Sequence, residues 1–219
     1  EYQHDEFKYP KENRVVIINK ADAKQTSLRI AKPSISRENE LYPALVLANT
    51  VYGGYFMSRL NNLLREIKGY TYGLRSNISA RKNGPVMSVG TDVNLESTAD
   101  AVLDILSEME LISGNPVKEE EFNTAMQYLL GAFSRKIETP QQIAMMIQGA
   151  DIYGLPADYF DDFFSDISKL TPEKVFEAQK KYLKPESIVI AAAGDAAKLR
   201  DALKEFGEIS ICDTEGNIS

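Results

Sequence analysis

The sequence predicts an α+β fold in which helices cover a largely antiparallel sheet. Strand-like segments come in two pairs in the first half of the chain, five helical segments follow one another, and a strand–helix–strand unit ends it. Hydrophobic residues are 43% of the 219 residues and charged residues 26%, which is typical of globular proteins. No repeat, low-complexity tract or linker divides the chain, so we expect a single domain over residues 1–219.

The first elements are two strands and a helix. Residues 14–19 and 26–31 have strand composition, and the polar link between them is turn-like, so we expect them to pair as a hairpin. Residues 37–51 carry apolar side chains at helical spacing, and Ser36 is a suitable N-cap.

A second helix and a hairpin follow. Gly53-Gly54 interrupts the helical pattern, and the next helix covers residues 56–68 and ends at Gly69, where a left-handed cap is wanted. Residues 70–80 and 86–93 alternate as strands, and the Lys-Asn-Gly-Pro sequence between them favours a hairpin turn.

The middle of the chain is helical. In residues 99–112 we expect the apolar positions 99, 102, 103, 106 and 109 to form the buried face. In residues 119–137 the apolar stripe is Phe122, Met126, Leu129 and Phe133. Three further helices are expected at 141–153, 159–168 and 172–183, the last with Thr171 as N-cap and Pro172 at its first position.

The last unit begins with the apolar run 188–193, which is typical of a strand buried on both faces. A short helix over 197–206 and a strand over 208–211 complete the prediction.

Charge is unevenly distributed. The net charge is −7, but residues 41–91 contain six basic residues and one acid. An acidic chain with one basic island is a poor nucleic-acid binder, so we expect no nucleic-acid partner. The island is either a solvated surface or a site for an acceptor-rich ligand such as a peptide backbone.

The rare residues exclude several kinds of site. The only cysteine is Cys212 and the only histidine is His4, so neither a disulfide framework nor a zinc site with two histidines can be built. No apolar run reaches the roughly 18 residues of a membrane span. The chain begins at Glu1 without Met, so we expect a mature form or a part of a longer protein.

The most informative stretch runs from Gly53 to Ser76. Arg65 lies in the last turn of the predicted helix, and Tyr70 and Tyr72 begin the next strand. A guanidinium beside a phenol suits hydrogen bonding to carbonyl oxygens. Alternatively, Arg65 complements the helix dipole and Tyr72 packs on the sheet.

This stretch resembles the C-terminal, zinc-free half-domain of the pitrilysin-like (insulinase-family) inverted-zincin peptidases, the group with the mitochondrial processing peptidase fold. That half-domain carries a signature close to G-G-x-F-x-S-R-L followed by L-R-E-x-x-G-x-x-Y. Here the two parts are Gly53 to Leu60, GGYFMSRL, and Leu64 to Tyr72, LREIKGYTY. The predicted order of elements fits the family over nearly the whole chain.

The resemblance implies a clamshell of two half-domains with peptide captured between them. The zinc-bearing half supplies the metal, so no cofactor is expected in this chain and zinc is expected in the partner half. The other half supplies an Arg/Tyr pair that holds the substrate backbone and assists at the transition state. By position these roles fall to Arg65 and Tyr72, with Tyr70 as the alternative phenol. The Gly53-Gly54 turn is expected to bring the following helix close to the central cavity.

The implied function is therefore the peptide-binding, non-catalytic half of a zinc endopeptidase, inactive without its partner. An alternative is a structural or assembly subunit with the same fold. An autonomous hydrolase is disfavoured because the acids lie mostly at solvent-facing positions and no pair stands out. Bacterial relatives occur in both periplasm and cytoplasm; the compartment is not fixed, and the periplasm is the preferred assignment.

Overall fold

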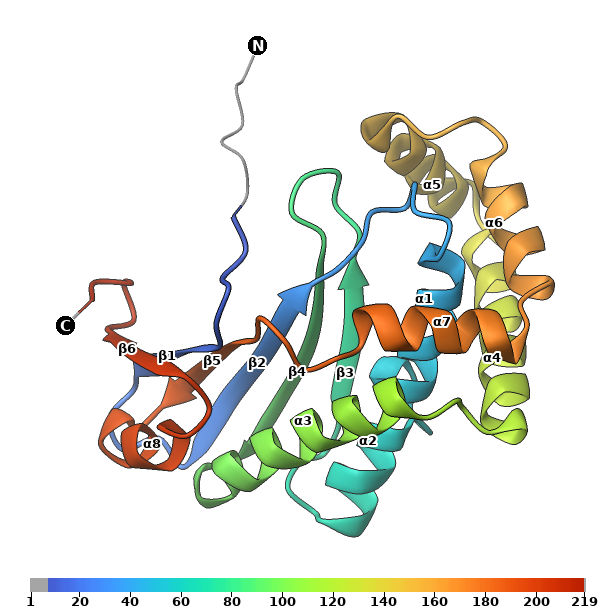
Figure 1. Ribbon diagram of the computed structural model, residues 1–219. Helices are drawn as coiled ribbons and strands as arrows, with labels where there is room; N and C mark the ends of the chain where they lie inside the picture. Colours follow the sequence, from blue (N-terminus) through green and yellow to red (C-terminus); the bar gives the residue numbers. More distant parts are fainter. Residues whose placement is uncertain (1–7, 219) are drawn as a thin grey trace.

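A computed structural model describes residues 8–218, and His4 lies outside them. Its centre is a six-stranded sheet with the order β3-β4-β2-β5-β1-β6, which runs from right to left in Figure 1. The strands are β1 (Arg14–Asn19), β2 (Gln25–Pro33), β3 (Leu74–Ser79), β4 (Val86–Asn94), β5 (Val189–Gly194) and β6 (Glu208–Cys212).

The sheet is mixed. Strand β2 pairs antiparallel with β4 and β5, and β3 pairs antiparallel with β4, whereas β1 pairs parallel with β5 and β6. The predicted helix-covered α+β sheet is confirmed, with antiparallel pairs in the majority. The predicted hairpin of the first two strands is wrong, because β5 lies between β1 and β2. A strand as apolar as β5 gains more stabilisation between two neighbouring strands than at the edge of the sheet. It therefore lies between β1 and β2, which are adjacent in sequence.

One face of the sheet carries the core. Val15, Ile17, Leu28 and Ile30 are buried, while the residues between them are half-buried or exposed. Strand β5 alternates in the same way, so its predicted burial on both faces is wrong. Its small alanines account for the apolar run without a second packed layer.

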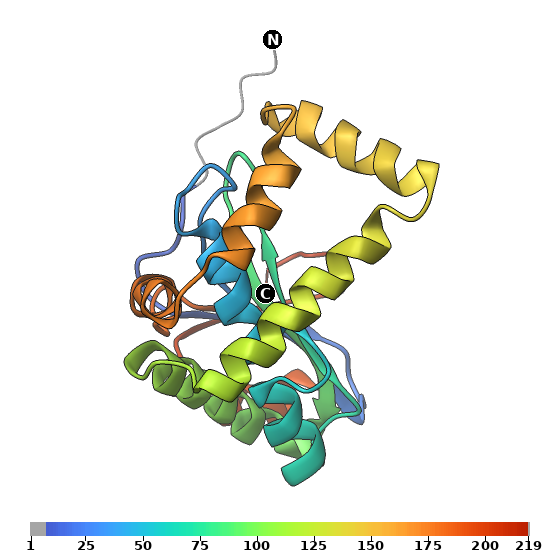
Figure 2. The same cartoon turned by 90° about the vertical axis from the view of Figure 1, so that its right-hand side faces the viewer.

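Over residues 8–218, eight α-helices cover the sheet and its β3 end. Figures 1 and 2 show α4, α5 and α6 arranged as three sides of a triangle beyond β3; we call these three the helical frame. The helices are α1 (Tyr42–Asn49), α2 (Arg59–Asn61), α3 (Thr98–Gly114), α4 (Glu119–Lys136), α5 (Pro140–Tyr153), α6 (Tyr159–Ser168), α7 (Pro172–Tyr182) and α8 (Ala196–Leu203).

The start of α1 corrects a prediction. The helix begins at Tyr42, not at residue 37, and Ser36 is not its N-cap. Inside a helix a proline lacks the N–H for the backbone hydrogen bond, and its ring would collide with the carbonyl four residues earlier. Pro43 is therefore tolerated only in the first turn, where it lies. Beyond Asn49 the helix continues as a π-helical segment, Thr50–Gly54, and the expected interruption follows directly after the two glycines, at the extended Tyr55.

The buried face of α3 also differs from the prediction. Leu103 is 55% exposed, whereas Ala101 and Ile105 are fully buried. The stripe is rotated toward positions 98, 101, 102, 105, 109 and 112. Packing against α7 and α8 selects this face, and the apolar residues of the sequence outnumber the positions that it offers.

Turn and capping residues predicted other element boundaries correctly. The β3–β4 hairpin forms with Gly84 at φ +69°, and Gly69 has the expected left-handed conformation at φ +66°. Helix α6 has the predicted bounds, and α7 begins at Pro172 with the Thr171 side chain accepting a hydrogen bond from the Lys174 N–H.

Candidate functional site

The candidate site is built on the segment that joins α1 to β3. Helix α2 begins at Arg59, three residues later than predicted, because the backbone of Ser58 is extended. The helix continues as the π-helical segment Asn62–Ile67 and ends before Gly69. Strand β3 begins only at Leu74, so both candidate tyrosines precede it.

Gly53 holds this segment against the sheet. A Cβ atom at Gly53 would lie 2.7 Å from the Cβ of Ser76 on β3 and 3.2 Å from a Leu60 methyl group. Only a residue without a side chain permits this approach. Gly53 therefore lets this segment pack closely onto β3. The expected approach of the following helix to a central cavity involves the other half-domain and stays a prediction.

Two asparagines bind the outer edge of β3. The amide of Asn61 accepts a hydrogen bond from the Leu74 N–H and donates to the Leu74 carbonyl, both at 3.1 Å, and Asn49 donates to the Ser76 carbonyl at 3.3 Å. These side chains take the place of a neighbouring strand. Sequence reasoning missed both; the available signal was an amide side chain next to apolar helix positions.

Arg59 joins the start of this segment to helices α3 and α4. It forms two hydrogen bonds with the Glu121 carboxylate, at 2.6 and 2.7 Å, and a third with Glu108 at 3.2 Å. Burial alone would raise the pKa of Glu121, but the hydrogen bonds and charge of Arg59 outweigh it and lower the pKa. The signature arginine is therefore structural and joins α2 to α3 and α4.

Arg65 is only partly engaged. Its guanidinium carbon lies 4.0 Å from the ring centre of Phe56, and its Nε lies 3.5 Å from a Glu66 carboxylate oxygen. One terminal nitrogen, Nη1, is buried and has no hydrogen-bond partner among the residues that the structure describes. Stacking on Phe56 holds the guanidinium in place, and the side chain is 31% exposed, so an acceptor can approach it.

The two tyrosines have different environments. Tyr70 is half-buried and packs against the core, and its backbone N–H donates to the Leu64 carbonyl at 2.9 Å. Tyr72 is 96% exposed, so the alternative that it packs on the sheet is wrong. Thr91 anchors the turn by donating to the Thr71 hydroxyl and the Gly73 carbonyl, at 2.9 and 3.1 Å. The turn is fixed while the Tyr72 side chain projects outward.

Exposed apolar side chains surround the predicted residues in sequence. Phe56, Met57, Ile67 and Tyr72 are each at least 65% exposed. We call residues 56–72 the Arg65 segment. Over residues 8–218, no hydrogen bond or ring contact joins Arg65 to Tyr70 or Tyr72, so the structure places them on one segment without direct contact.

Neither a metal site nor a membrane span is found in the described part of the chain. Residues 8–218 contain no group of three His, Cys, Asp or Glu side chains that could hold a metal, so the donors present do not fit a zinc site. Across the same residues, no helix has the length and apolar character needed to cross a bilayer.

Comparison with known proteins agrees with the geometry. Residues 2–129 match the family model described as "Peptidase M16 inactive domain". A protein of Bacillus subtilis named "Probable inactive metalloprotease YmfF" is 25% identical over 81% of this chain and 40% of its own length.

Solved structures show the same fold. The peptidase M16 inactive domain from Pseudomonas fluorescens superposes with a TM-score of 0.78 at 26% identity, over 87% of this chain and 45% of that one. A protease from Helicobacter pylori gives 0.78 at 12% identity, over 87% and 46%.

The present chain thus spans less than half the length of these relatives. The family model covers more than half of this chain, including the whole Arg65 segment. The chain belongs to the peptidase M16 inactive-domain family, as the zinc-free half-domain that its signature predicted.

Proposed function

We propose that this chain is the peptide-binding, non-catalytic half of a zinc-dependent endopeptidase. The observation that carries the proposal is the Arg65 segment, where a stacked and partly exposed arginine is flanked by exposed apolar side chains. A fixed donor beside exposed apolar surface suits an extended peptide, which offers carbonyl acceptors and side chains in alternation.

Arg65 is proposed to bind a peptide carbonyl near the scissile bond. Stacking on Phe56 restricts its guanidinium, so little conformational entropy is lost when it binds. Tyr72, rather than Tyr70, is proposed as the second donor because its phenol is exposed, whereas Tyr70 is engaged in packing.

The metal-dependent chemistry belongs to the other half in this proposal. The residues described here do not fit a zinc site, and the relatives are more than twice the length matched. This chain would bind and orient the peptide and would place donors where negative charge develops. Its partners are a zinc-bearing half-domain, in the same or a separate polypeptide, and an unstructured peptide.

The test is turnover of a quenched-fluorescent unstructured peptide by the assembly of this chain with its zinc-bearing half. We expect Arg65→Gln to lower kcat/KM by roughly 10²–10³-fold, the range for loss of one preorganised donor. Tyr72→Phe is expected to lower it by about tenfold. Tyr70→Phe is expected to have little effect.

Arg200→Gln, on the exposed face of α8, is the matched control for loss of one positive charge. Circular dichroism and co-elution with the zinc-bearing half establish that each variant folds and assembles. Unchanged turnover in folded, assembled Arg65→Gln would contradict the role of Arg65. A larger loss in Tyr70→Phe than in Tyr72→Phe would reassign the phenol.

A second candidate is an assembly subunit without peptidase function. Helix α5 favours it, because Ile143, Met145, Ile147 and Ile152 are all exposed on it. Such side chains are typical of a surface that another protein covers. A stable assembly that cleaves no member of a varied peptide panel, with or without Arg65, supports this candidate over the first.

A further inference from the structure

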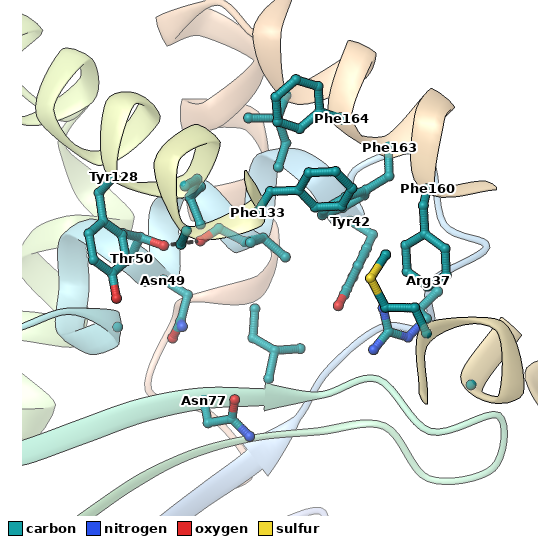
Figure 3. Close-up of a pocket in the computed structure, with 18 of the residues that line it drawn as sticks. Arg37, Tyr42, Asn49, Thr50, Asn77, Tyr128, Phe133, Phe160, Phe163 and Phe164 are labelled. Carbon is teal, nitrogen blue, oxygen red and sulfur yellow. Dashed lines mark hydrogen bonds between the residues drawn. The ribbon is translucent and has the colours of Figure 1, made fainter. Parts of the chain in front are cut away.

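A cavity of about 580 Å³ lies between the helical frame, α1 and the edge of β3 (Figure 3). Its volume is within the roughly 300–1,000 Å³ of small-molecule sites. No residue of the Arg65 segment lines it. Met145 on its α5 wall is 65% exposed, so the cavity can be reached from solvent.

Most of the cavity wall is aromatic or aliphatic. The rings of Phe133 and Phe164 lie 4.8 Å apart, and those of Tyr42 and Phe163 lie 5.7 Å apart. Met145 and Met146 extend this wall from α5. Such a surface favours a ligand with an apolar body, which gains free energy by leaving water.

One end of the cavity carries positive charge. Arg37 lies between two aromatic rings, with its guanidinium carbon 5.7 Å from the centre of Tyr42 and 5.5 Å from that of Tyr153. Its Nε is buried and makes no hydrogen bond within the usual geometric limits among the described residues, although the guanidinium lies close enough to the Tyr159 hydroxyl to oppose the rise in pKa that burial gives that tyrosine. Figure 3 shows the Arg37 guanidinium and the Tyr42 hydroxyl pointing into the same space. Burial raises the pKa of Tyr42, partly opposed by Arg37, so the hydroxyl keeps its proton and can donate.

The charges of the lining favour an anion. Arg37 and Arg75 line the cavity, and the described residues that line it include no Asp or Glu, although the chain has a net charge of −7. A planar guanidinium and a phenol together match a carboxylate, which accepts two hydrogen bonds from the one and a third from the other.

Some of the other polar groups on the wall are already engaged. Asn49 and Ser76 hydrogen-bond each other, and the Thr50 hydroxyl donates to the Val46 carbonyl at 2.8 Å. A peptide in the cavity would bring backbone groups against the aromatic and aliphatic part of the wall, where they find no partners, at a cost in free energy. A molecule with one polar end and an otherwise apolar body avoids this cost.

We propose that the cavity binds a small amphipathic carboxylate of the fatty-acid class. Its carboxylate accepts hydrogen bonds from Arg37 and Tyr42, and its hydrocarbon chain lies against Phe133, Phe163 and Phe164. The proposal is independent of the peptide-binding role of the Arg65 segment.

The test is isothermal titration calorimetry of the protein with decanoate, below its micelle concentration, and with decan-1-ol, which has the same chain and no charge. We expect decanoate to bind with one-to-one stoichiometry and more tightly than the alcohol. Arg37→Gln should weaken decanoate about tenfold or more and leave the alcohol nearly unchanged, because it removes the charged partner alone. Arg200→Gln is the charge-matched control and should leave both affinities unchanged.

A second pair of variants tests the location. A Cβ atom at Gly149, on the cavity wall, has no neighbour within 4 Å, so Gly149→Phe can be accommodated and should fill the cavity and abolish binding of both ligands. Gly131 on α4 is equally open but does not line the cavity, so Gly131→Phe should leave binding intact.

Three results would overturn the proposal. The first is no binding of decanoate to the folded protein. The second is equal binding by wild type and Arg37→Gln, or by wild type and Gly149→Phe. The third is tighter, Arg37-dependent binding of a tripeptide that ends in Phe with a free carboxylate, which would assign the site to a peptide C-terminus.

Discussion

Helices α1 and α5 are stabilised in opposite ways. Seven of the eight residues of α1 are buried, yet its N-cap is Leu41 and no side chain caps it. None of the 14 residues of α5 is buried, yet Thr139 and Gln142 form a complete capping box and Gly154 ends the helix in the left-handed conformation. Burial therefore holds the helices beside the sheet, while local hydrogen bonding holds the outermost side of the helical frame.

The largest expected effect tests burial. Leu45→Ala in α1 removes a fully buried side chain and should lower the free energy of unfolding by roughly 2–5 kcal/mol. Ile147→Ala in α5, where the side chain is 64% exposed, should change it by less than about 0.5 kcal/mol. Urea denaturation of both variants measures the difference. Equal destabilisation would show that α5 is packed in solution and would remove the contrast.

A second prediction uses a charge inside the packed region. Burial lowers the pKa of Lys32 to about 8, partly opposed by the charge of Glu186, and its Nζ donates to the Tyr182 carbonyl at the end of α7. The lysine of the unfolded chain keeps its proton to near pH 10.5, so the unfolded state binds more protons between about pH 8 and 10.5. The free energy of unfolding should therefore rise with pH over this range, by roughly 1–3 kcal/mol.

Lys32→Met isolates this contribution from other titrations. The difference in unfolding free energy between wild type and Lys32→Met, measured by urea denaturation across the same pH range, should change in favour of wild type as pH rises. A constant difference would mean that Lys32 is not desolvated as the structure indicates.

The smallest effect concerns the caps. Thr139→Ala should destabilise α5 locally by about 1 kcal/mol and leave global unfolding within about 0.5 kcal/mol, because α5 buries no residue. Faster amide hydrogen exchange confined to residues 140–153 is the expected signature. The matched variant Thr171→Ala removes the N-cap of α7, which does bury residues, and should lower global stability by about 1 kcal/mol. The same exchange pattern in both variants would contradict the distinction.

The accuracy of sequence reasoning followed the range of the interactions involved. The bounds of α6, the N-terminus of α7 and the β3–β4 turn depend on residues a few positions apart, and they were predicted correctly. The pairing of β1 with β5 joins Arg14 to Val189, and no local pattern encodes it. The buried face of α3 was misplaced for the same reason, since α7 and α8 select it from an excess of apolar positions.

The candidate site divides in the same way. The signature located the Arg65 segment. Composition could not show that the Arg59 guanidinium is hydrogen-bonded to Glu121 and Glu108, whereas one Arg65 nitrogen has no partner among the described residues. Nor could composition distinguish Tyr70 from Tyr72, which lie two residues apart on the turn that Thr91 fixes. Only the structure shows that the phenol of Tyr72 is the exposed one. Asn49 and Asn61 were missed because their partners are the backbone of a strand 13 or more residues away.

The asparagine bonds to β3 have a consequence for the order of events during synthesis. Asn49, Asn61, β3 and β4 all lie within the first 94 residues, whereas β1 and β2 obtain their shared neighbour β5 only when the ribosome has passed residue 194. Contacts of low sequence separation form first, so the β3 margin is covered while the chain is still nascent. Until β5 is made, β1 and one side of β2 lack the neighbour that they have in the folded sheet.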